Sequence, residues 1–188
     1  MRGDLKDGDL LLYHVLPSDT LDIQRLISLG EQDGSKADFQ YYHAGLVIDV
    51  VNDQGFEQNP PAMHYTKLSQ EPWGRIDVYR PTVPIDVAKL RAWCASSLGS
   101  PYPYGQIAKF LAADAAAELT GLGVLEKLID LPASGRSPHL DVCSATDADA
   151  LDDASGGKMG WDRQDADMRP CDLTSGNVVL VVDGSAQA

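Results

Sequence analysis

The sequence has few cysteines and no long apolar run. Its 188 residues include three cysteines, Cys94, Cys143 and Cys171, which are widely spaced and form no CxxC pair. An odd number of isolated cysteines fits neither a disulfide framework nor a cysteine-rich zinc site, and it indicates a reducing compartment. No apolar run is long enough to span a bilayer, and the first residues lack the apolar core of a secretory signal. We therefore expect a protein made in the cytoplasm, with export that needs no cleavable signal as the open alternative.

The chain is also poor in basic residues. It contains 15 lysine and arginine residues against 28 aspartate and glutamate residues, which gives a formal net charge of −13. Nucleic acids and anionic membrane surfaces favour proteins with basic patches, so this balance argues against both as general partners. The acids that follow Cys143 (Asp147, Asp149, Asp152 and Asp153) lack the spacing of a calcium loop and predict a solvated helix face. We therefore expect no metal site and no cofactor.

The hydrophobic pattern predicts a single α+β domain over residues 1–188, with a core from about residue 8 to 182. Period-two alternation and turn residues predict strands over 8–13, 41–51, 55–58, 75–80 and 177–183. Helical spacing predicts helices over 21–29, from Pro84 to Gly99, over 106–131 and from Cys143 onward, whereas 152–176 are predicted to be loop. We expect the strands to form a small antiparallel sheet or half-barrel packed against the helices.

Cys143 is the strongest candidate for a chemically active residue. It lies where a loop rich in proline and glycine gives way to an alanine-rich helical pattern, so its thiol is expected at a helix N-terminus. The partial positive charge there favours thiolate over thiol and makes the sulfur a better nucleophile. Cys94, on an apolar helix face beside Trp93, and Cys171, in a loop, are expected to be inert.

A cysteine nucleophile needs a base, and His43 is the best placed of the four histidines. It stands at the head of a predicted strand, where it can pair with a cysteine at a helix start. His14, His64 and His139 are the alternatives, and we rank His64 second. His139 precedes Cys143 by only four residues, but it lies in a proline-containing loop where helical spacing does not apply.

Six short segments, taken in order, carry a family resemblance. They are Gly8-Asp-Leu-Leu-Leu12, His43-Ala-Gly-Leu-Val-Ile48, Phe56-Glu57, Ser100-Pro-Tyr-Pro-Tyr-Gly105, Val142-Cys-Ser144 and Arg169-Pro-Cys-Asp-Leu173. Their order over roughly residues 8–182 resembles the circularly permuted branch of the NlpC-type papain-fold superfamily, which includes the YiiX- and YaeF-like proteins and relatives of lecithin:retinol acyltransferase. Ala145-Thr146 departs from the acidic and aliphatic residues usual after Cys-Ser, and the helical stretch 106–131 is long. The resemblance implies a papain-like fold and a cysteine hydrolase or acyltransferase.

The expected mechanism uses Cys143 as the nucleophile and His43 as the proton carrier. A third polar side chain should hold the imidazole in place, and Glu57, just beyond the turn that follows the His43 strand, is our candidate. Because strand side chains alternate with period two, a register slip of one residue would present Gln58 instead. Attack on a carbonyl carbon would give a thioester, which water or another acceptor then resolves.

Tyr102 and Ser144 are the predicted oxyanion or substrate residues, alongside the backbone amide at the helix start. The resemblance implies two substrate classes, cell-wall peptides with γ-glutamyl bonds and lipid or fatty-acyl esters and amides. An acidic protein tolerates a cationic or zwitterionic substrate better than a polyanionic one, so we favour amide hydrolysis. A lipid or fatty-acyl hydrolase or acyltransferase is the alternative, and an inactive binding module is a second. The apolar residues 107–131 either complete the core as a helical pair, which we favour, or roof an acyl-binding groove.

Overall fold

The structure is a computed structural model, and it describes residues 4–14, 41–102, 143–161 and 170–184. Within these residues, six antiparallel strands form one sheet. The strands are β1 (Leu10–His14), β2 (Tyr41–Asp49), β3 (Gln54–Asn59), β4 (Ala62–Lys67), β5 (Ile76–Pro81) and β6 (Val178–Val182), in the order β4-β3-β2-β1-β5-β6. The same residues form the helices α2 (Val87–Ser97) and α5 (Cys143–Ser155), and 3-10 turns at Leu68–Gln70, Trp73–Arg75 and Pro170–Thr174. The predicted α+β class with a small antiparallel sheet is confirmed.

The predicted strands correspond to β1, β2, β3, β5 and β6. The sequence pattern gives no clear signal for β4, because only Met63 of its residues is buried and the apolar alternation is weak. The loop prediction for 152–176 is wrong at both ends, since α5 continues to Ser155 and Pro170–Thr174 forms a 3-10 turn. The helices predicted over 21–29 and 106–131 lie outside the described residues. No helix in the described ranges is long and apolar enough to cross a membrane.

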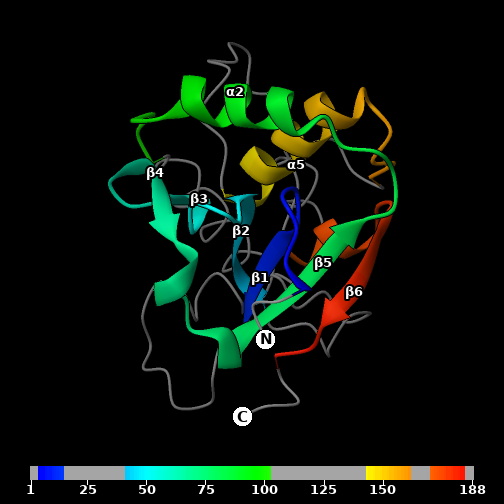
Figure 1. Ribbon diagram of the computed structural model, residues 1–188, viewed down its shortest axis with the longest axis horizontal. Coiled ribbons are helices and arrows are strands. Elements are labelled where there is room, and N and C mark those ends of the chain that lie inside the picture. Colours follow the sequence, from blue (N-terminus) through cyan, green and yellow to red (C-terminus); the bar gives the residue numbers. More distant parts are fainter. Residues whose placement is uncertain (1–3, 15–40, 103–142, 162–169, 185–188) are drawn as a thin grey trace, which may run out of the picture.

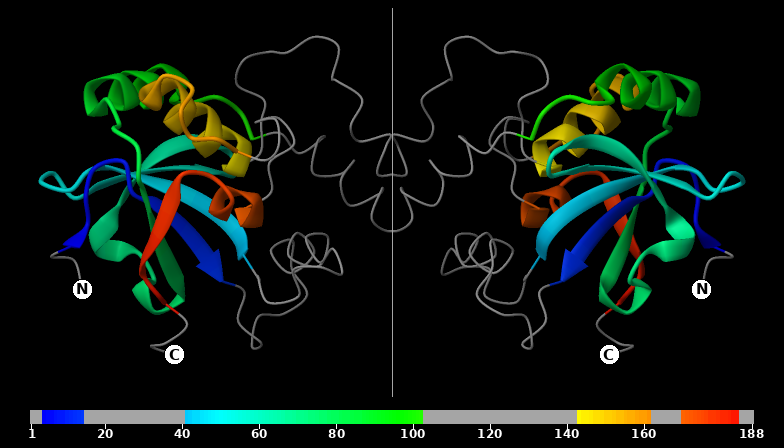
Figure 2. Two further views of the ribbon diagram at one scale, coloured as in Figure 1. Left: turned by 90° about the vertical axis from the view of Figure 1, so that its right-hand side faces the viewer. Right: turned by 90° about the vertical axis from the view of Figure 1, so that its left-hand side faces the viewer.

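Both α-helices pack against the same face of the sheet, where they lie beside each other (Figures 1 and 2). Successive strand residues point to opposite faces, so Leu10 and Leu12 of β1 join a core cluster with Leu90 of α2 and Leu151 of α5. Leu11 points the other way, into a second apolar cluster with residues of β2 and β5. Because β1 is buried on both faces, it reads as a continuous apolar run in the sequence.

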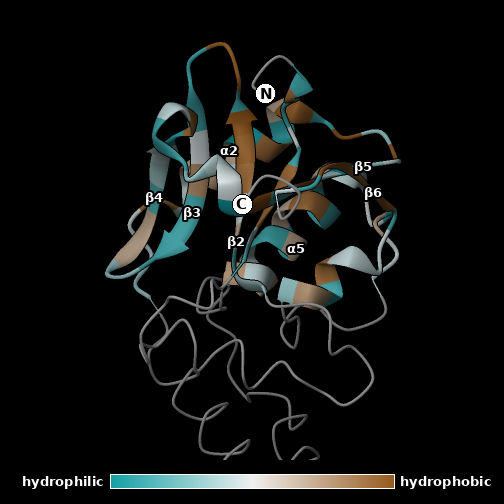
Figure 3. Cartoon of the chain, turned by 90° about the horizontal axis from the view of Figure 1, so that it is seen from below, coloured by the Kyte–Doolittle hydropathy of each residue, from teal (hydrophilic) through white to brown (hydrophobic). Residues whose placement is uncertain are grey.

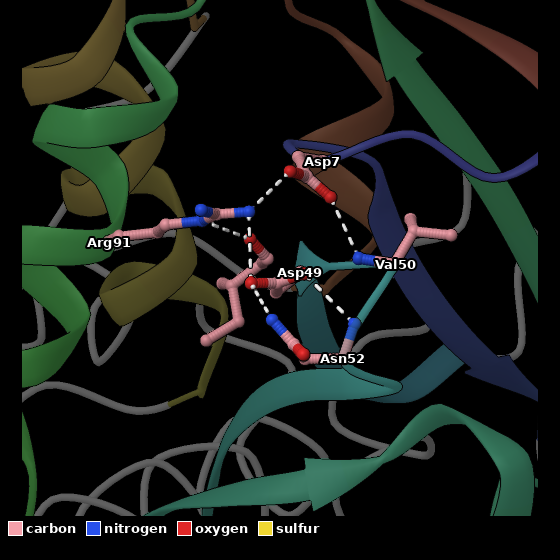
Figure 4. A network of polar contacts seen from close by, with 6 residues as sticks. Asp7, Asp49, Val50, Asn52 and Arg91 are labelled. Atoms are coloured by element: carbon pink, nitrogen blue, oxygen red, sulfur yellow. Dashed lines mark hydrogen bonds and ion pairs between the residues drawn. The ribbon is translucent and has the colours of Figure 1, made fainter.

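An ion-pair network fixes α2 to the end of β2 (Figure 4). Arg91 of α2 donates to the backbone oxygen of Ile48 at 2.8 Å and forms ion pairs with Asp7 at 2.7 Å and Asp49 at 3.1 Å. Asp7 also accepts a hydrogen bond of 2.8 Å from the backbone N–H of Val50. One arginine thereby joins the helix to the segment before β1 and to the end of β2.

Asp9, the acid of the opening Gly-Asp motif, ties β1 to β5. Its carboxylate, 1% exposed, accepts two hydrogen bonds from Arg80, 2.8 Å from Nε and 2.7 Å from Nη2, and a third from the backbone N–H of Lys6. The paired geometry is the strong form of an arginine–carboxylate contact. Gly8, with φ +91°, takes the left-handed conformation that lets the chain turn into β1. This motif therefore has an architectural role in the described core.

Candidate active site

Buried polar residues gather on β3, a strand that is coloured as mostly hydrophilic in Figure 3. Glu57 and Gln58 are only 4% and 0% exposed. Burial of polar side chains costs free energy unless they are hydrogen-bonded, so each needs a partner inside the protein. The two residues find their partners on opposite faces of the sheet.

The register between β2 and β3 brings Glu57 to His43. Glu57 pairs directly with Gly45, and His43 lies two residues before Gly45 on the same face. The Glu57 side chain extends over Gly45, and its Oε2 lies 3.0 Å from His43 Nε2. A Cβ atom at position 45 would lie 2.8 Å from Glu57 Cγ, so this contact requires glycine there.

Gln58 lies on the helix-covered face instead. Its Oε1 accepts a hydrogen bond of 2.5 Å from the Thr146 hydroxyl of α5. Of the two alternatives for the third residue, the structure therefore brings Glu57, and not Gln58, against His43.

Cys143 lies at the N-terminal end of the described part of α5, and its side chain is buried. The His43 side chain and the backbone N–H groups of Ala44 and Ser144 lie close enough to the sulfur to stabilise its ionised form by charge and hydrogen bonding. Burial alone raises the pKa of the thiol, but the His43 charge and these hydrogen bonds outweigh it and hold the pKa of Cys143 below its ordinary value. The position thus favours a thiolate.

His43 shows the complementary shift. Burial alone lowers the pKa of the imidazole, whereas the charge and hydrogen bonds of Cys143 and Glu57 raise it, and the pKa of His43 ends well above its ordinary value. Since Nε2 faces Glu57, Nδ1 is the ring nitrogen left for the thiol. A thiolate–imidazolium pair is the protonation state that these contacts stabilise.

Glu57 is held as an acceptor by three side chains. Besides His43, it accepts hydrogen bonds of 2.5 Å from the Tyr13 hydroxyl and 2.5 Å from the Asn59 amide. Burial raises the pKa of Glu57, but the contacts with His43 and Tyr13 lower it by more. The net shift of the Glu57 pKa is therefore downward. Tyr13 and Asn59 are absent from the sequence prediction. Asn59 could have been found from its period-two spacing from Glu57, which puts both side chains on one face of β3. Tyr13 is placed at the site because it pairs with His43 across β1 and β2.

The other two cysteines lie in the apolar core. Cys94 is fully buried in α2, where burial and the nearby Asp147 raise the pKa of its thiol to about 12. Cys171 is buried in the 3-10 turn Pro170–Thr174 and packs in the same apolar cluster as Cys94. Cys143 differs from Cys94 in having an imidazole beside its sulfur.

The rival histidines have other contacts. His14 Nε2 lies 2.9 Å from Asp77 Oδ1. His64 is exposed, and its Nδ1 lies 2.9 Å from the backbone oxygen of Ala62. His139 lies outside the described residues. Only His43, of the three described histidines, meets the Cys143 sulfur.

The predicted oxyanion or substrate residues lie in different settings. Ser144 is fully buried, and its backbone N–H faces the Cys143 sulfur. Tyr102 is half-buried, and its backbone N–H donates to the Pro61 oxygen at 2.9 Å. The oxyanion or substrate roles of Ser144 and Tyr102 both stay predictions.

Asp147 corrects the prediction of a solvated acidic face after Cys143. It lies one turn beyond the nucleophile and is 1% exposed, although Asp153 on the same helix is exposed. Neither of its carboxyl oxygens has a hydrogen-bond partner among the residues that the structure describes. Burial and the charge of Cys143 raise the pKa of Asp147 well above its ordinary value, which favours the neutral acid.

Sequence comparison gives no independent assignment. No protein-family model matches this sequence, and no curated protein matches it significantly. Within the described residues no group of three histidine, cysteine, aspartate or glutamate side chains is arranged to hold a metal ion. The chemistry available to the site is that of the contacts among Cys143, His43 and Glu57.

Proposed function

We propose that this protein is a cysteine hydrolase that cleaves an amide bond through a Cys143–His43–Glu57 triad. The observation that carries the proposal is the buried arrangement in which His43 lies beside the Cys143 sulfur and has its Nε2 3.0 Å from Glu57 Oε2. It lowers the pKa of the thiol and raises that of the imidazole, which is the arrangement that an activated cysteine nucleophile needs.

In the proposed reaction the Cys143 thiolate attacks the carbonyl carbon of the substrate and forms a C–S bond. The tetrahedral oxyanion is stabilised by N–H groups at the start of α5. His43 gives its proton to the leaving nitrogen as the C–N bond breaks, which leaves a thioester and a neutral imidazole. Water then attacks the thioester, His43 takes the proton from it, and the acid leaves as the thiolate–imidazolium pair is restored.

Glu57 would act through His43. An ionised carboxylate at Nε2 fixes the orientation of the ring and stabilises the imidazolium that forms in each half of the cycle. The cluster of acceptor contacts on Glu57, with a pKa below its ordinary value, supports this role.

The papain-like, permuted NlpC-type assignment is part of the same proposal. It is supported by an α+β core in which the nucleophile begins a helix, the histidine lies on a central strand and the acid lies on the neighbouring strand. On this basis we propose a γ-glutamyl-containing cell-wall peptide as the substrate class. The net charge of −13 supports a cationic or zwitterionic peptide over a polyanionic substrate.

The test is hydrolysis of a panel that contains a γ-D-glutamyl peptide, its α-linked isomer and a fatty-acyl ester. Release of the product is followed together with intact-protein mass, which detects an acyl group on the enzyme. We expect cleavage of the γ-linked peptide by the wild type and by Cys94→Ala, and loss of cleavage in Cys143→Ala. Equal turnover by the wild type and Cys143→Ala would contradict Cys143 as the nucleophile, and no turnover of any substrate would favour an inactive binding module instead.

A further inference from the structure

A second carboxyl group reaches the site through Tyr13. The Tyr13 hydroxyl lies 2.5 Å from Glu57 Oε1 and 3.0 Å from Glu71 Oε2. Tyr13 is 3% exposed on β1, whereas Glu71, immediately after the 3-10 turn Leu68–Gln70, is half-buried. The chain of contacts from Cys143 through His43, Glu57 and Tyr13 therefore continues to a carboxyl group nearer the surface.

The number of protons in this chain restricts its charge state. A phenolic hydroxyl has one proton and can donate it to one carboxylate at a time. If Glu57 and Glu71 were both ionised, one of the two contacts of Tyr13 would join two acceptor oxygens with no proton between them. A proton on Glu71 removes this conflict, because Glu71 then donates to the Tyr13 oxygen and Tyr13 donates to Glu57.

The surroundings of the two acids favour this order. Glu57 accepts from His43 and Asn59 as well, which stabilises its ionised form. Burial and the charge of Glu57 raise the pKa of Glu71, whereas the pKa of Glu57 is lowered. The titratable groups that face this pair from the described strands are Tyr13 on β1, His43 on β2, Glu57 on β3 and His64 on β4.

We propose that Tyr13 and Glu71 are positioning residues that hold Glu57 ionised and aimed at His43, with protonated Glu71 as the donor at the outer end. Their catalytic consequence rests on the proposed cysteine chemistry, because the Tyr13 hydroxyl and the Glu71 carboxyl act on it through Glu57. When Glu71 loses its proton, the single proton of Tyr13 is divided between two carboxylates and the hold on Glu57 weakens. The ionisation of Glu71 should therefore affect the reactivity of Cys143.

The proton order can be measured without any substrate. The sequence has five glutamates, so protein labelled with ¹³C at the glutamate carboxyls gives few resonances, and Glu57→Gln and Glu71→Gln assign the two of interest. We expect Glu71 to titrate above the ordinary glutamate value of about 4.3, and Glu57 below it. Titration of Glu71 at or below that value would refute the proposal, since Tyr13 would then face two ionised acids.

The positioning role has a second readout, the pH profile of Cys143 alkylation by iodoacetamide. The wild type should show an inflection at the pKa of Glu71, in addition to the ionisation of the thiol. Glu71→Gln, whose amide donates at every pH, should lack that inflection. Tyr13→Phe should lack it too and should raise the apparent pKa of Cys143 by about half a unit to one unit, as one charge-assisted hydrogen bond is lost.

Asp53→Asn is the matched control. It removes one carboxyl from the turn between β2 and β3, at a residue with φ 59° that asparagine tolerates, and it should leave the inflection in place. An inflection that persists in Glu71→Gln would refute the positioning role while leaving the triad intact. If Glu71 titrates as expected but wild-type Cys143 does not label, the proton order is supported and the cysteine chemistry fails.

Discussion

Gly45→Ala should disrupt the candidate site while leaving every proposed functional side chain in the sequence. The new Cβ would lie 2.8 Å from Glu57 Cγ and 3.3 Å from the Phe56 oxygen. Ordinary carbon–carbon contact is about 3.5–4 Å, so the Glu57 side chain must move by roughly 1 Å. Its bond to His43 is 3.0 Å long, and a shift of that size takes it beyond hydrogen-bonding distance.

The energetic consequences have opposite signs. In a strand interior, alanine is favoured over glycine by about 0.5–1 kcal/mol through chain entropy. Loss of a hydrogen bond to a charged group costs about 1.5–3 kcal/mol, which outweighs that entropic gain. We therefore expect Gly45→Ala to be less stable by about 1–2 kcal/mol, and the apparent pKa of Cys143 to rise by about one to two units.

The assay combines urea unfolding with the pH profile of Cys143 alkylation. Gly74→Ala is the control, because a Cβ there meets no atom within 4 Å and the residue does not have a positive φ. A folded Gly45→Ala protein with the same apparent thiol pKa as Gly74→Ala would refute the argument that Glu57 sets the ionisation of the pair. A stabilised Gly45→Ala protein would refute the steric argument itself.

Two further predictions concern buried carboxyl groups. Arg80→Ala leaves the buried carboxylate of Asp9 without its paired donor, and we expect a loss of about 3 kcal/mol or more in urea unfolding; a loss under about 1 kcal/mol would contradict the pairing. Asp147→Asn should gain stability relative to the wild type as pH rises. The raised pKa means that folded Asp147 keeps its proton above pH 4 whereas the unfolded chain releases it, so wild-type stability falls by up to about 1.4 kcal/mol per pH unit until the folded pKa is reached. The unfolding free energies of the wild type and of Asp147→Asn, measured from pH 4 to 8, should therefore differ by an amount that changes with pH. A difference that is the same at every pH would contradict a neutral Asp147.

Local patterns predict the elements that carry the nucleophile and the base. The alanine-rich run predicts that Cys143 belongs to a helix, and the alternating run from Tyr41 predicts that His43 lies on a strand, as the structure has them. The position of Glu57 is open to a one-residue slip because strand side chains repeat with period two. The observed register pairs it with Gly45, a residue that has no side chain to block the path to His43.

Long-range contacts cannot be predicted from the sequence in the same way. Tyr13 and Glu71 are 58 residues apart, and no periodicity connects a residue of β1 with one that follows a 3-10 turn. The acidic neighbours of Asp147 predict a solvated side chain, but the helix turns it toward the core. Charge patterning reports the average exposure of a helix and not the face on which a given acid lies.

The central claim is that His43 activates Cys143, and site-resolved iodoacetamide labelling against pH tests it most directly. Labelling is quantified by mass spectrometry for Cys143 and for the buried Cys94 in the wild type and in His43→Ala. We predict that Cys143 labels selectively, with an apparent pKa well below the value of about 8.5 for a free thiol, and that this selectivity disappears in His43→Ala. Labelling of Cys143 no faster than Cys94, or equally fast without His43, would contradict the account.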